Sequence, residues 1–195
     1  MTNLMRAAQH VLFIQGGGEG AFAADKPLAE SLQRSLGPDY QVHYPAMPSE
    51  DDPSDAIWHR EIQRELEKMG DEVVLVGHSV GAYLLLKFVV SDRGRRPLAG
   101  IFLIATPFVG RGGWELNEIA MSEDFAENLP SDTPIVLYHA RDDEVVPFGH
   151  LGIYRQKIPQ ATVREFETGG HQLNNDLSVV AADIRRVADR ISPGS

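Results

Sequence analysis

Residues 73–81 read VVLVGHSVG, an apolar run that leads directly into the pattern Gly-x-Ser-x-Gly. The residues that follow, 82–90, are mostly apolar and predict a helix. On a sharp turn from strand to helix, the backbone approaches itself so closely that a Cβ atom two residues before or after the serine would clash. Gly77 and Gly81 remove these two Cβ atoms. The stretch therefore predicts an exposed, nucleophilic Ser79.

Outward from this stretch, short apolar runs alternate with longer runs of helical period, which is typical of parallel strands joined by crossover helices. The expected strands are 10–15, 40–44, 72–77, 98–105, 134–140 and 161–167. The expected helices are 26–36, 55–69, 80–92, 149–157 and 177–191. The pattern predicts an α/β fold, a doubly wound, mostly parallel six-stranded sheet with helices on both faces.

The domain organisation follows from length and continuity. A chain of 195 residues without an internal repeat or a linker predicts a single domain over 1–195. Residues 107–130 do not fit the alternation of strands and helices. We expect this segment to be either a small flap or an ordinary long connection that packs on the sheet edge.

The composition excludes several classes of function. Lys and Arg number 18 against 28 Asp and Glu, a formal net charge of −10 that disfavours nucleic acid and anionic membranes as partners. The absence of cysteine excludes disulfides, thiolate metal sites and a cysteine nucleophile. No histidine or aspartate pattern has metal-ligand spacing, and no segment has the character of a signal peptide or a membrane helix. We expect a cytoplasmic protein without a metal, and the oligomeric state stays open.

Partners for the serine lie downstream in the chain. A serine hydroxyl needs an imidazole to remove its proton and a carboxylate to orient that imidazole. The turn after the strand expected at 134–140 carries Asp142 and Asp143, and His171 follows two glycines that let its loop fold back toward Ser79. The chain order Ser, Asp, His is the order expected of α/β-hydrolases.

On these motifs the sequence resembles the α/β-hydrolases. Its small size and early glycine-rich loop make it similar to the compact, lidless serine hydrolases of the retinoblastoma-binding serine hydrolase type, over residues 10–191. In such proteins the acid lies in an Asp-x-x-Val-Pro-like turn, which residues 143–147 match while Asp142 stands one residue too early. The resemblance implies Asp143 as the acid and no cofactor. Asp142 remains the alternative, its other role being that of a turn residue.

The resemblance also implies an oxyanion hole, because acyl transfer develops negative charge on the carbonyl oxygen and two backbone N–H groups stabilise it. We expect one donor from Val80 and the other from the loop at 15–20, QGGGEG. Relatives often carry His-Gly followed by the donor at this place. By that alignment Gly17 is the donor, with Gly18 close behind, although Gln15 replaces the histidine and leaves the choice open.

Substrate contacts are expected from loops at the carboxyl edge of the sheet, where ligands bind in open α/β folds. These loops either line an acyl pocket or simply cover the sheet, and their apolar residues are Phe22, Met47, Phe108, Val109 and Trp114. Three residues are our candidates for substrate binding: Gly18, Phe108 and Trp114. We expect His78 to be a packed neighbour of the serine and the acidic run 50–52 to be a solvated face.

These expectations combine into one function. Ser79 attacks the carbonyl of a carboxylic ester or a related acyl compound, His171 moves the proton, and Asp143 orients the imidazole in an acyl-enzyme mechanism. A thioesterase or an amidase would use the same residues. A binding protein built on a hydrolase scaffold is the remaining alternative.

Overall fold

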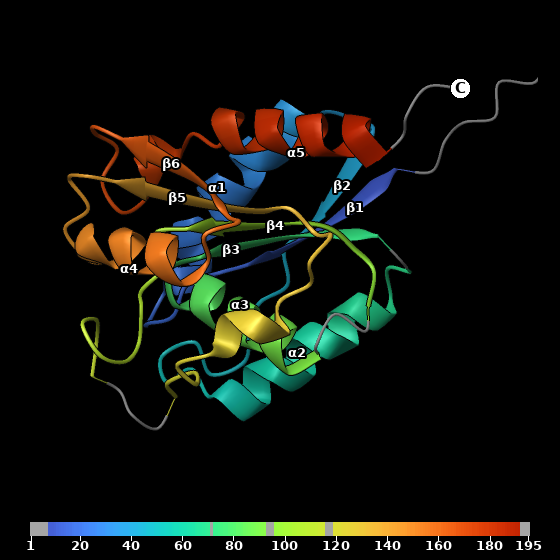
Figure 1. Cartoon of the computed structure of the whole chain (residues 1–195). Helices are drawn as coiled ribbons and strands as arrows, with labels where there is room; N and C mark the ends of the chain where they lie inside the picture. Colours follow the sequence, from blue (N-terminus) through green and yellow to red (C-terminus); the bar gives the residue numbers. More distant parts are fainter. Residues whose placement is uncertain (1–7, 71, 93–95, 116–118, 192–195) are drawn as a thin grey trace, which may run out of the picture.

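The computed structural model describes a single parallel sheet flanked by two layers of helices (Figure 1). In the described part of the chain six strands pair in the order β2-β1-β3-β4-β5-β6, and each pair is parallel. The strands are β1 (Gln9–Ile14), β2 (Tyr40–His43), β3 (Val73–His78), β4 (Leu98–Ile104), β5 (Ile135–Ala140) and β6 (Thr162–Phe166). The doubly wound sheet expected from the sequence is confirmed. The described residues are 8–70, 72–92, 96–115 and 119–191.

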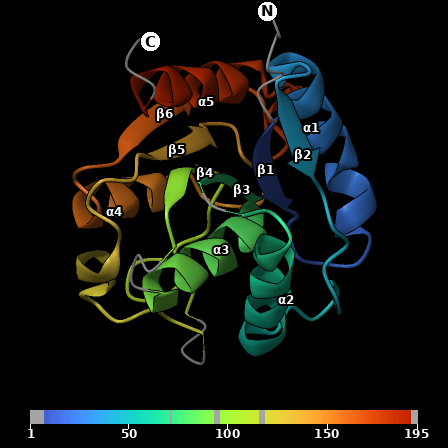
Figure 2. The ribbon, with the colours of Figure 1, turned by 90° about the vertical axis from the view of Figure 1, so that its right-hand side faces the viewer.

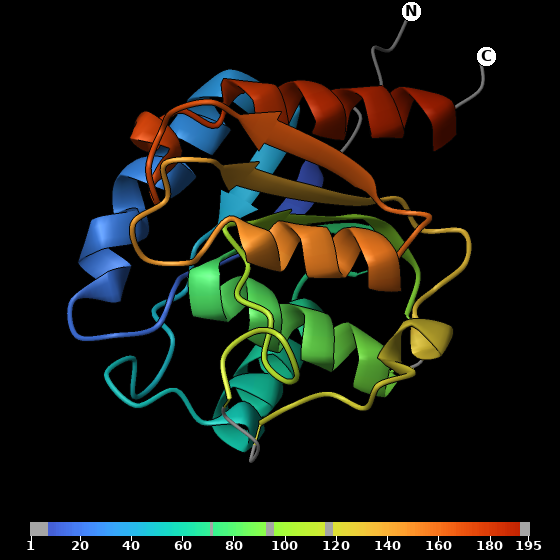
Figure 3. The ribbon, with the colours of Figure 1, turned by 60° about the vertical axis from the view of Figure 1, so that its left-hand side comes forward.

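Helices cover both faces of this sheet. The α-helices are α1 (Ala21–Leu36), α2 (Asp55–Glu67), α3 (Ser79–Asp92), α4 (Gly149–Lys157) and α5 (Ser178–Ile191). α1 and α5 lie together on one face, while α2, α3 and α4 lie on the other, as the views in Figures 2 and 3 agree. Two short 3-10 helices complete the fold, η1 (Phe125–Asn128) and η2 (Leu173–Asn175). Within the described residues, no helix has both the length and the apolar character needed to cross a bilayer.

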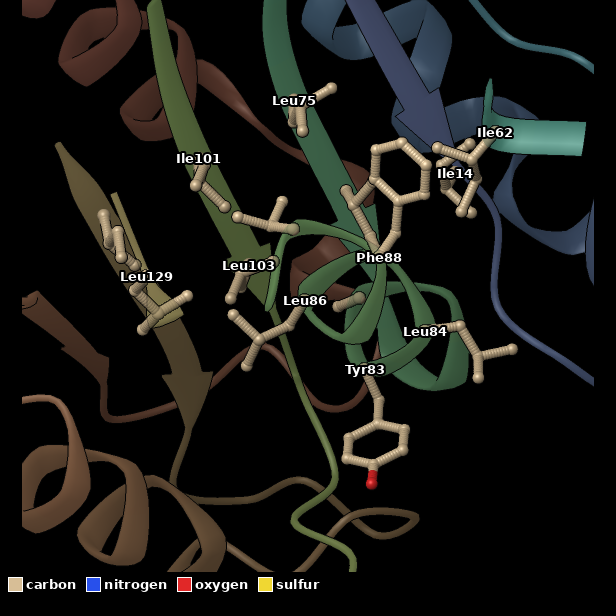
Figure 4. Close-up of a cluster of buried hydrophobic side chains, with 14 of the residues drawn as sticks. Ile14, Ile62, Leu75, Tyr83, Leu84, Leu86, Phe88, Ile101, Leu103 and Leu129 are labelled. Atoms are coloured by element: carbon tan, nitrogen blue, oxygen red, sulfur yellow. The ribbon is translucent and has the colours of Figure 1, made fainter. Parts of the chain in front are cut away.

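The core consists of two apolar layers, one on each face of the sheet. Alternate residues of β3 enter opposite layers: Leu75 packs toward α2 and α3, and Val76 packs toward α1 and α5. Figure 4 shows Leu75 and Ile101 from the sheet with Phe88 of α3 in the first of these layers. Because both faces are buried, β3 is apolar along its length instead of alternating with polar residues.

The main departure from the expected elements is the start of α1. We expected this helix to begin at about Lys26, next to Pro27. The helix instead begins at Ala21, directly after Gly20, whose φ of 77° is left-handed. Pro27 therefore lies inside α1. The consequence is that the second turn of α1 brings Asp25 to the carboxyl end of the sheet.

Hydrogen bonds attach the segment 107–130 to α3. Tyr83 of α3 donates from its hydroxyl to the carbonyl of Ile119 at 2.7 Å and accepts from the amide of Met121 at 3.2 Å. Val109 and Trp114 form an isolated parallel bridge. The part of the expected flap at 116–118 lies outside the described residues.

The strand order locates the site. β1 and β3 are neighbours, and the connections that leave them lead to α1 on one face and α3 on the other. Such a point, where the strand order reverses, opens a crevice beyond the carboxyl ends of the strands. The glycine-rich loop follows β1 and Ser79 follows β3, so both lie at this crevice.

Candidate active site

Ser79 occupies the junction between β3 and α3, with a left-handed φ of 52°. The two flanking glycines are required by close packing. A Cβ atom on Gly77 would lie 2.6 Å from Cα of Ala82, and one on Gly81 would lie 1.8 Å from the carbonyl oxygen of Gln15. No other residue fits at either position, so this sharp turn depends on both glycines.

Asp143 and His171 form a direct pair. Nδ1 of His171 lies 2.9 Å from Oδ2 and 3.1 Å from Oδ1 of Asp143. The amides of Val145 and Val146 donate to Oδ1, and Nε2 of His139 lies 3.1 Å from Oδ2. Burial alone would raise the pKa of Asp143, but hydrogen bonds from the two histidines and these amides outweigh it and hold the pKa well below its usual range. Asp143 is therefore an ionised acceptor that fixes the orientation of His171.

Asp142 has a different position. Its carboxylate accepts hydrogen bonds from the amides of Gly169, at 3.2 Å, and Gly170, at 2.8 Å. These two glycines have positive φ and lead into His171. Asp142 thus holds the loop that carries the histidine, whereas Asp143 contacts the imidazole itself.

Ser79 and His171 line one cavity of about 200 Å³. The same cavity is lined by Gly18 and by Val145, whose side chain is half exposed beside the imidazole. No hydrogen bond joins the Ser79 hydroxyl to His171 in this structure. Such bonds are often long in unliganded enzymes and tighten when substrate binds.

The glycine-rich loop carries Gly17 and Gly18, the two candidates for the second oxyanion donor. The amide of Gly16 donates to Oδ2 of Asp25 at 2.7 Å, and the amide of Gly18 donates to the carbonyl of Glu50. Among the described residues the Gly17 amide has no hydrogen-bond partner. A Cβ atom on Gly17 would lie 2.5 Å from Cγ of Pro53, so only glycine fits there. Of the two candidates in the loop, Gly17 is the one with an amide available to a ligand.

Val80, the other expected donor, is the second residue of α3. Amides in the first turn of a helix have no acceptor within the helix and point beyond its end. The side chain of Val80 lies close to Gly17, because a Cβ atom on Gly17 would be 3.3 Å from it. The two residues that we expect to donate therefore lie close to each other.

Glu50 contacts the glycine-rich loop, which sequence reasoning missed, since we expected the run 50–52 to be a solvated face. Its carboxylate accepts from Nε2 of Gln15 at 2.7 Å and from the amides of Gly20 and Phe22. The hydrogen bond from Phe22, followed by that from Gln15, lowers the pKa of Glu50. Gln15 is fully buried and also accepts from the amide of Met47. Glu50 and Gln15 together hold the glycine-rich loop in place.

A second cavity of about 600 Å³ adjoins Gly17 and Val80. Its lining is mostly apolar and consists of Gly17, Asp52, Pro53, Val80, Tyr83, Pro107, Val109, Trp114, Glu115 and Ile119. Gly17 lines both this cavity and the smaller one that holds Ser79. An acyl group bonded to Ser79 could extend from the smaller space into the larger one.

The expected substrate contacts differ in their positions. Trp114 lines the larger cavity and Gly18 the smaller one. Phe108 lines neither, because its ring packs edge-on against Tyr154 and its amide donates to Nδ1 of His150. The larger residues of a loop pack inward wherever a buried partner is available, and the sequence does not reveal that partner.

Two loop residues proposed for an acyl pocket lie elsewhere. Met47 is buried in the core layer of α2 and α3, and Phe22 stacks on Tyr44 with their ring centroids 4.7 Å apart. Neither lines the cavities described above. Within the residues that the structure describes, no cluster of three or more histidine, aspartate or glutamate side chains is arranged to hold a metal ion.

Asp25 is a second residue that sequence reasoning missed. It is buried and contacts His78, the residue before the serine. The available signal was its spacing: Asp25 shares the buried face of α1 with Leu28, Leu32 and Leu36. A carboxylate at an apolar-face position requires a buried partner. The helix expected from Lys26 onward began too late to reveal it.

Comparisons with known proteins agree with this geometry. A family model described as serine hydrolase matches residues 28–177. Among solved structures, Arabidopsis thaliana SOBER1 is similar at 16% identity and a TM-score of 0.69, covering 93% of this chain and 100% of that one. The ydeN gene product of B. subtilis is 21% identical with a TM-score of 0.72 and the same two coverages.

A chain from the metagenome-derived lipolytic enzymes LipS and LipT is 18% identical with a TM-score of 0.73, covering 92% of this chain and 95% of that one. At these identities the structural likenesses establish the α/β-hydrolase fold. No curated protein matches the sequence.

Proposed function

The chain belongs to the serine hydrolase family, and we propose that this hydrolase cleaves a carboxylic ester through an acyl-enzyme formed on Ser79. The observation that carries the proposal is that Ser79, on its left-handed turn, lines the same cavity as His171, whose Nδ1 lies 2.9 Å from Asp143. A nucleophile, a base and a carboxylate that orients the base are the parts that acyl transfer requires.

In the proposed mechanism, the Ser79 hydroxyl oxygen attacks the carbonyl carbon while Nε2 of His171 takes the hydroxyl proton. The resulting tetrahedral oxyanion accepts hydrogen bonds from the amides of Gly17 and Val80. Neither amide has to break an existing hydrogen bond to do so. Collapse of this intermediate breaks the bond to the alcohol, which leaves with the proton from His171. Water then attacks the acyl-enzyme with His171 again as the base, and the acid is released.

The cavities suggest the shape of the substrate. The larger space, of about 600 Å³, adjoins Gly17 and Val80 and has a mostly apolar lining. Pockets of this volume hold small, drug-sized ligands. We propose that it receives a short or medium acyl chain while the smaller space near Val145 receives the alcohol.

The test is the intact mass after exposure to a fluorophosphonate, with Ser79→Ala and His171→Ala beside the wild-type chain. Ser91→Ala is the matched control, because Ser91 is an exposed serine near the far end of the same helix. We expect one adduct on the wild type and on Ser91→Ala, and none on the other two variants.

Turnover of p-nitrophenyl esters of increasing chain length completes the test. Ser79→Ala should lower kcat by about a million-fold, since the members of such a triad act as a unit. Equal turnover by Ser79→Ala and wild type would refute the assigned nucleophile. A steep rise in kcat/KM toward long lipid chains would refute the proposed chain length, and no labelling of the wild type would favour a binding role on this scaffold.

A further inference from the structure

Asp25 and His78 form a buried contact that the proposed mechanism does not use. Oδ2 of Asp25 lies 2.8 Å from Nδ1 of His78, and the two side chains are 2% and 1% exposed. Asp25 comes from α1, which follows β1, whereas His78 is the last residue of β3. The contact therefore joins the two segments that meet at the crevice of the sheet.

The remaining polar atoms of this pair extend the connection to the rest of the site. Oδ2 of Asp25 also accepts from the amide of Gly16, at 2.7 Å, immediately before the free amide of Gly17. Nε2 of His78 lies 2.9 Å from the carbonyl oxygen of His171. One buried pair thus contacts the glycine-rich loop, the turn that carries Ser79 and the backbone of His171.

Gln172 adds a second link to the same loop. Its Nε2 donates to Oδ1 of Asp25 at 2.9 Å, and Gln172 directly follows His171. Both carboxylate oxygens of Asp25 are therefore engaged. The carboxylate holds the residue after His171, while His78 holds the carbonyl of His171 itself.

Both ring nitrogens of His78 have buried partners. One ring nitrogen faces a carboxylate and the other a carbonyl, and both of these groups only accept hydrogen bonds. The ring of His78 is therefore held from both of its nitrogens. Burial opposes ionisation of Asp25, but the hydrogen bond from His78 and its charge outweigh this and lower the pKa of the carboxyl. The ring of His171 is the other titratable group against His78, with centroids 4.7 Å apart.

This arrangement excludes His78 as a rival base. Its two nitrogens are engaged by Asp25 and by the carbonyl of His171, and neither contacts the Ser79 hydroxyl. Both carboxylate oxygens of Asp25 are likewise engaged, by Gly16, His78 and Gln172. The pair therefore acts on the reaction only through the segments that it holds.

We propose that Asp25 and His78 are positioning residues, a buried hydrogen-bonded pair that sets the glycine-rich loop and the loop of His171 relative to Ser79. The inference rests on the proposed function, because the three segments matter together only if they carry one reaction. A displacement of reacting groups by about 1 Å can cost about a hundredfold in rate. The pair should therefore affect kcat far more than KM.

The test compares Asp25→Asn and His78→Gln with a matched variant, Asp183→Asn. Asp183 is also a buried aspartate, at 5% exposed, and it hydrogen-bonds Tyr138 and Arg164 without lining either cavity. Asp183→Asn therefore reports the loss of stability that follows from neutralising a buried carboxylate. Melting temperatures and the folded fraction are measured for all variants, and rates are expressed per folded molecule.

We expect Asp25→Asn and His78→Gln to lower kcat by about 10- to 100-fold, with KM changed less than about threefold, and to slow fluorophosphonate labelling by the same factor as kcat. Asp183→Asn should keep the wild-type kcat. The inference is overturned if either site variant keeps kcat within twofold of the wild type, or if Asp183→Asn loses as much.

A measurement on the unaltered chain keeps the inference testable even if both variants unfold. With ¹⁵N-labelled histidine, the ring N–H of His78 that faces Asp25 should show the strongly deshielded proton of a hydrogen bond to a carboxylate, protected from exchange with solvent. The signal is assigned by its loss in His78→Gln or, where that variant does not fold, by through-bond correlation. A proton that exchanges rapidly with solvent would overturn the buried pair. The spectrum does not depend on turnover, so failure of the proposed function, seen as full activity in Ser79→Ala, is distinguishable from failure of this inference.

Discussion

Oδ2 of Asp143 lies 2.9 Å from Nδ1 of His171, across a gap of 28 residues in the chain. This contact engages Nδ1, so Nε2 is the ring nitrogen that the proposed mechanism uses as the base. The lowered pKa of Asp143 keeps the carboxylate ionised throughout the neutral range, with burial the opposing effect and its hydrogen bonds the stronger one. Both the orientation of the His171 ring and the negative charge beside it depend on Asp143.

Asp143→Asn should therefore lower kcat by about 10⁴-fold, because an amide in place of the carboxylate favours the wrong tautomer of the imidazole. Asp142→Asn is the matched control: it keeps one carbonyl acceptor for the loop amides and does not touch the ring. We expect it to lose less than about tenfold. Steady-state turnover of a neutral ester measures both, and a larger loss in Asp142→Asn would reverse the assignment of the acid.

Gly17→Ala should lower kcat without unfolding the chain. Its new Cβ atom would lie 2.5 Å from Cγ of Pro53, so the loop must shift and carry its free amide away from the oxyanion. Loss of one such donor costs about 10²- to 10³-fold in kcat.

Gly152→Ala is the control for this prediction, because Gly152 lies within α4 with open space around it. Alanine there should raise the free energy of unfolding by about 0.5–1 kcal/mol and leave kcat unchanged. If kcat stayed at the wild-type value in Gly17→Ala, the second donor would have to be sought elsewhere in the loop.

The stability of the chain should fall in mild acid through His150. Burial, and next the nearby His139, lower the pKa of His150, and its Nδ1 accepts a hydrogen bond from the amide of Phe108 at 2.9 Å. The folded state thus binds the proton less readily than the unfolded chain. The contribution of His150 is fully present above about pH 6.5 and is lost as the pH falls through the folded pKa.

His150→Gln isolates this effect, since a glutamine carbonyl can accept the same hydrogen bond without titrating. Denaturant unfolding between pH 8 and pH 5 should give the wild type a steeper loss of stability than the variant. His43, whose pKa is also lowered by burial, contributes equally to both proteins. Parallel pH curves for the two would show that His150 does not titrate as described.

The charges around the larger cavity predict a preference among esters. Asp52 and Glu115 are exposed members of its lining, and no Lys or Arg lies among the lining residues. An acyl chain that ends in an ammonium group should therefore have a higher kcat/KM than one that ends in a carboxylate. About 1 kcal/mol for exposed charges corresponds to a preference of several-fold.

The double variant Asp52→Asn/Glu115→Gln should bring the two esters to similar kcat/KM values, whereas Asp51→Asn, a neighbouring exposed aspartate outside the lining, should not. Added salt should weaken the preference, because exposed charges are screened. A preference that survives both the double variant and salt would have to come from another part of the site.

Much of the fold was predictable because its signals are local. The run 73–81 and the alternation of apolar and helical periods predict the sheet, and most expected elements match the observed ones within one or two residues. The expected start of α1 was wrong, since the helix begins at Ala21, directly after Gly20. The left-handed conformation of Gly20 marks this boundary, and that conformation is seen only in the structure.

Some residues of the site could also be predicted from the sequence, and others could not. Ser79 and His171 were identifiable from the glycines beside them in the sequence, and the structure brings both residues to one cavity. Asp25 was missed because the expected helix began after it, and Glu50 was missed because nothing in the acidic run 50–52 distinguishes a carboxylate that holds a loop from one that faces solvent. Their partners, His78 and Gln15, lie 53 and 35 residues away.

By itself, then, the sequence determined the alternation of strands and helices, the sharp turn at Ser79 and the chain order of the residues expected to act with it. Tertiary structure alone decided whether Gly17 or Gly18 has a free amide, which aspartate contacts His171, and that Phe108 packs against Tyr154 instead of lining a cavity. The physical reason is range. Steric requirements of the backbone act between near neighbours in the chain, whereas hydrogen bonds and burial depend on residues that only the folded sheet brings together.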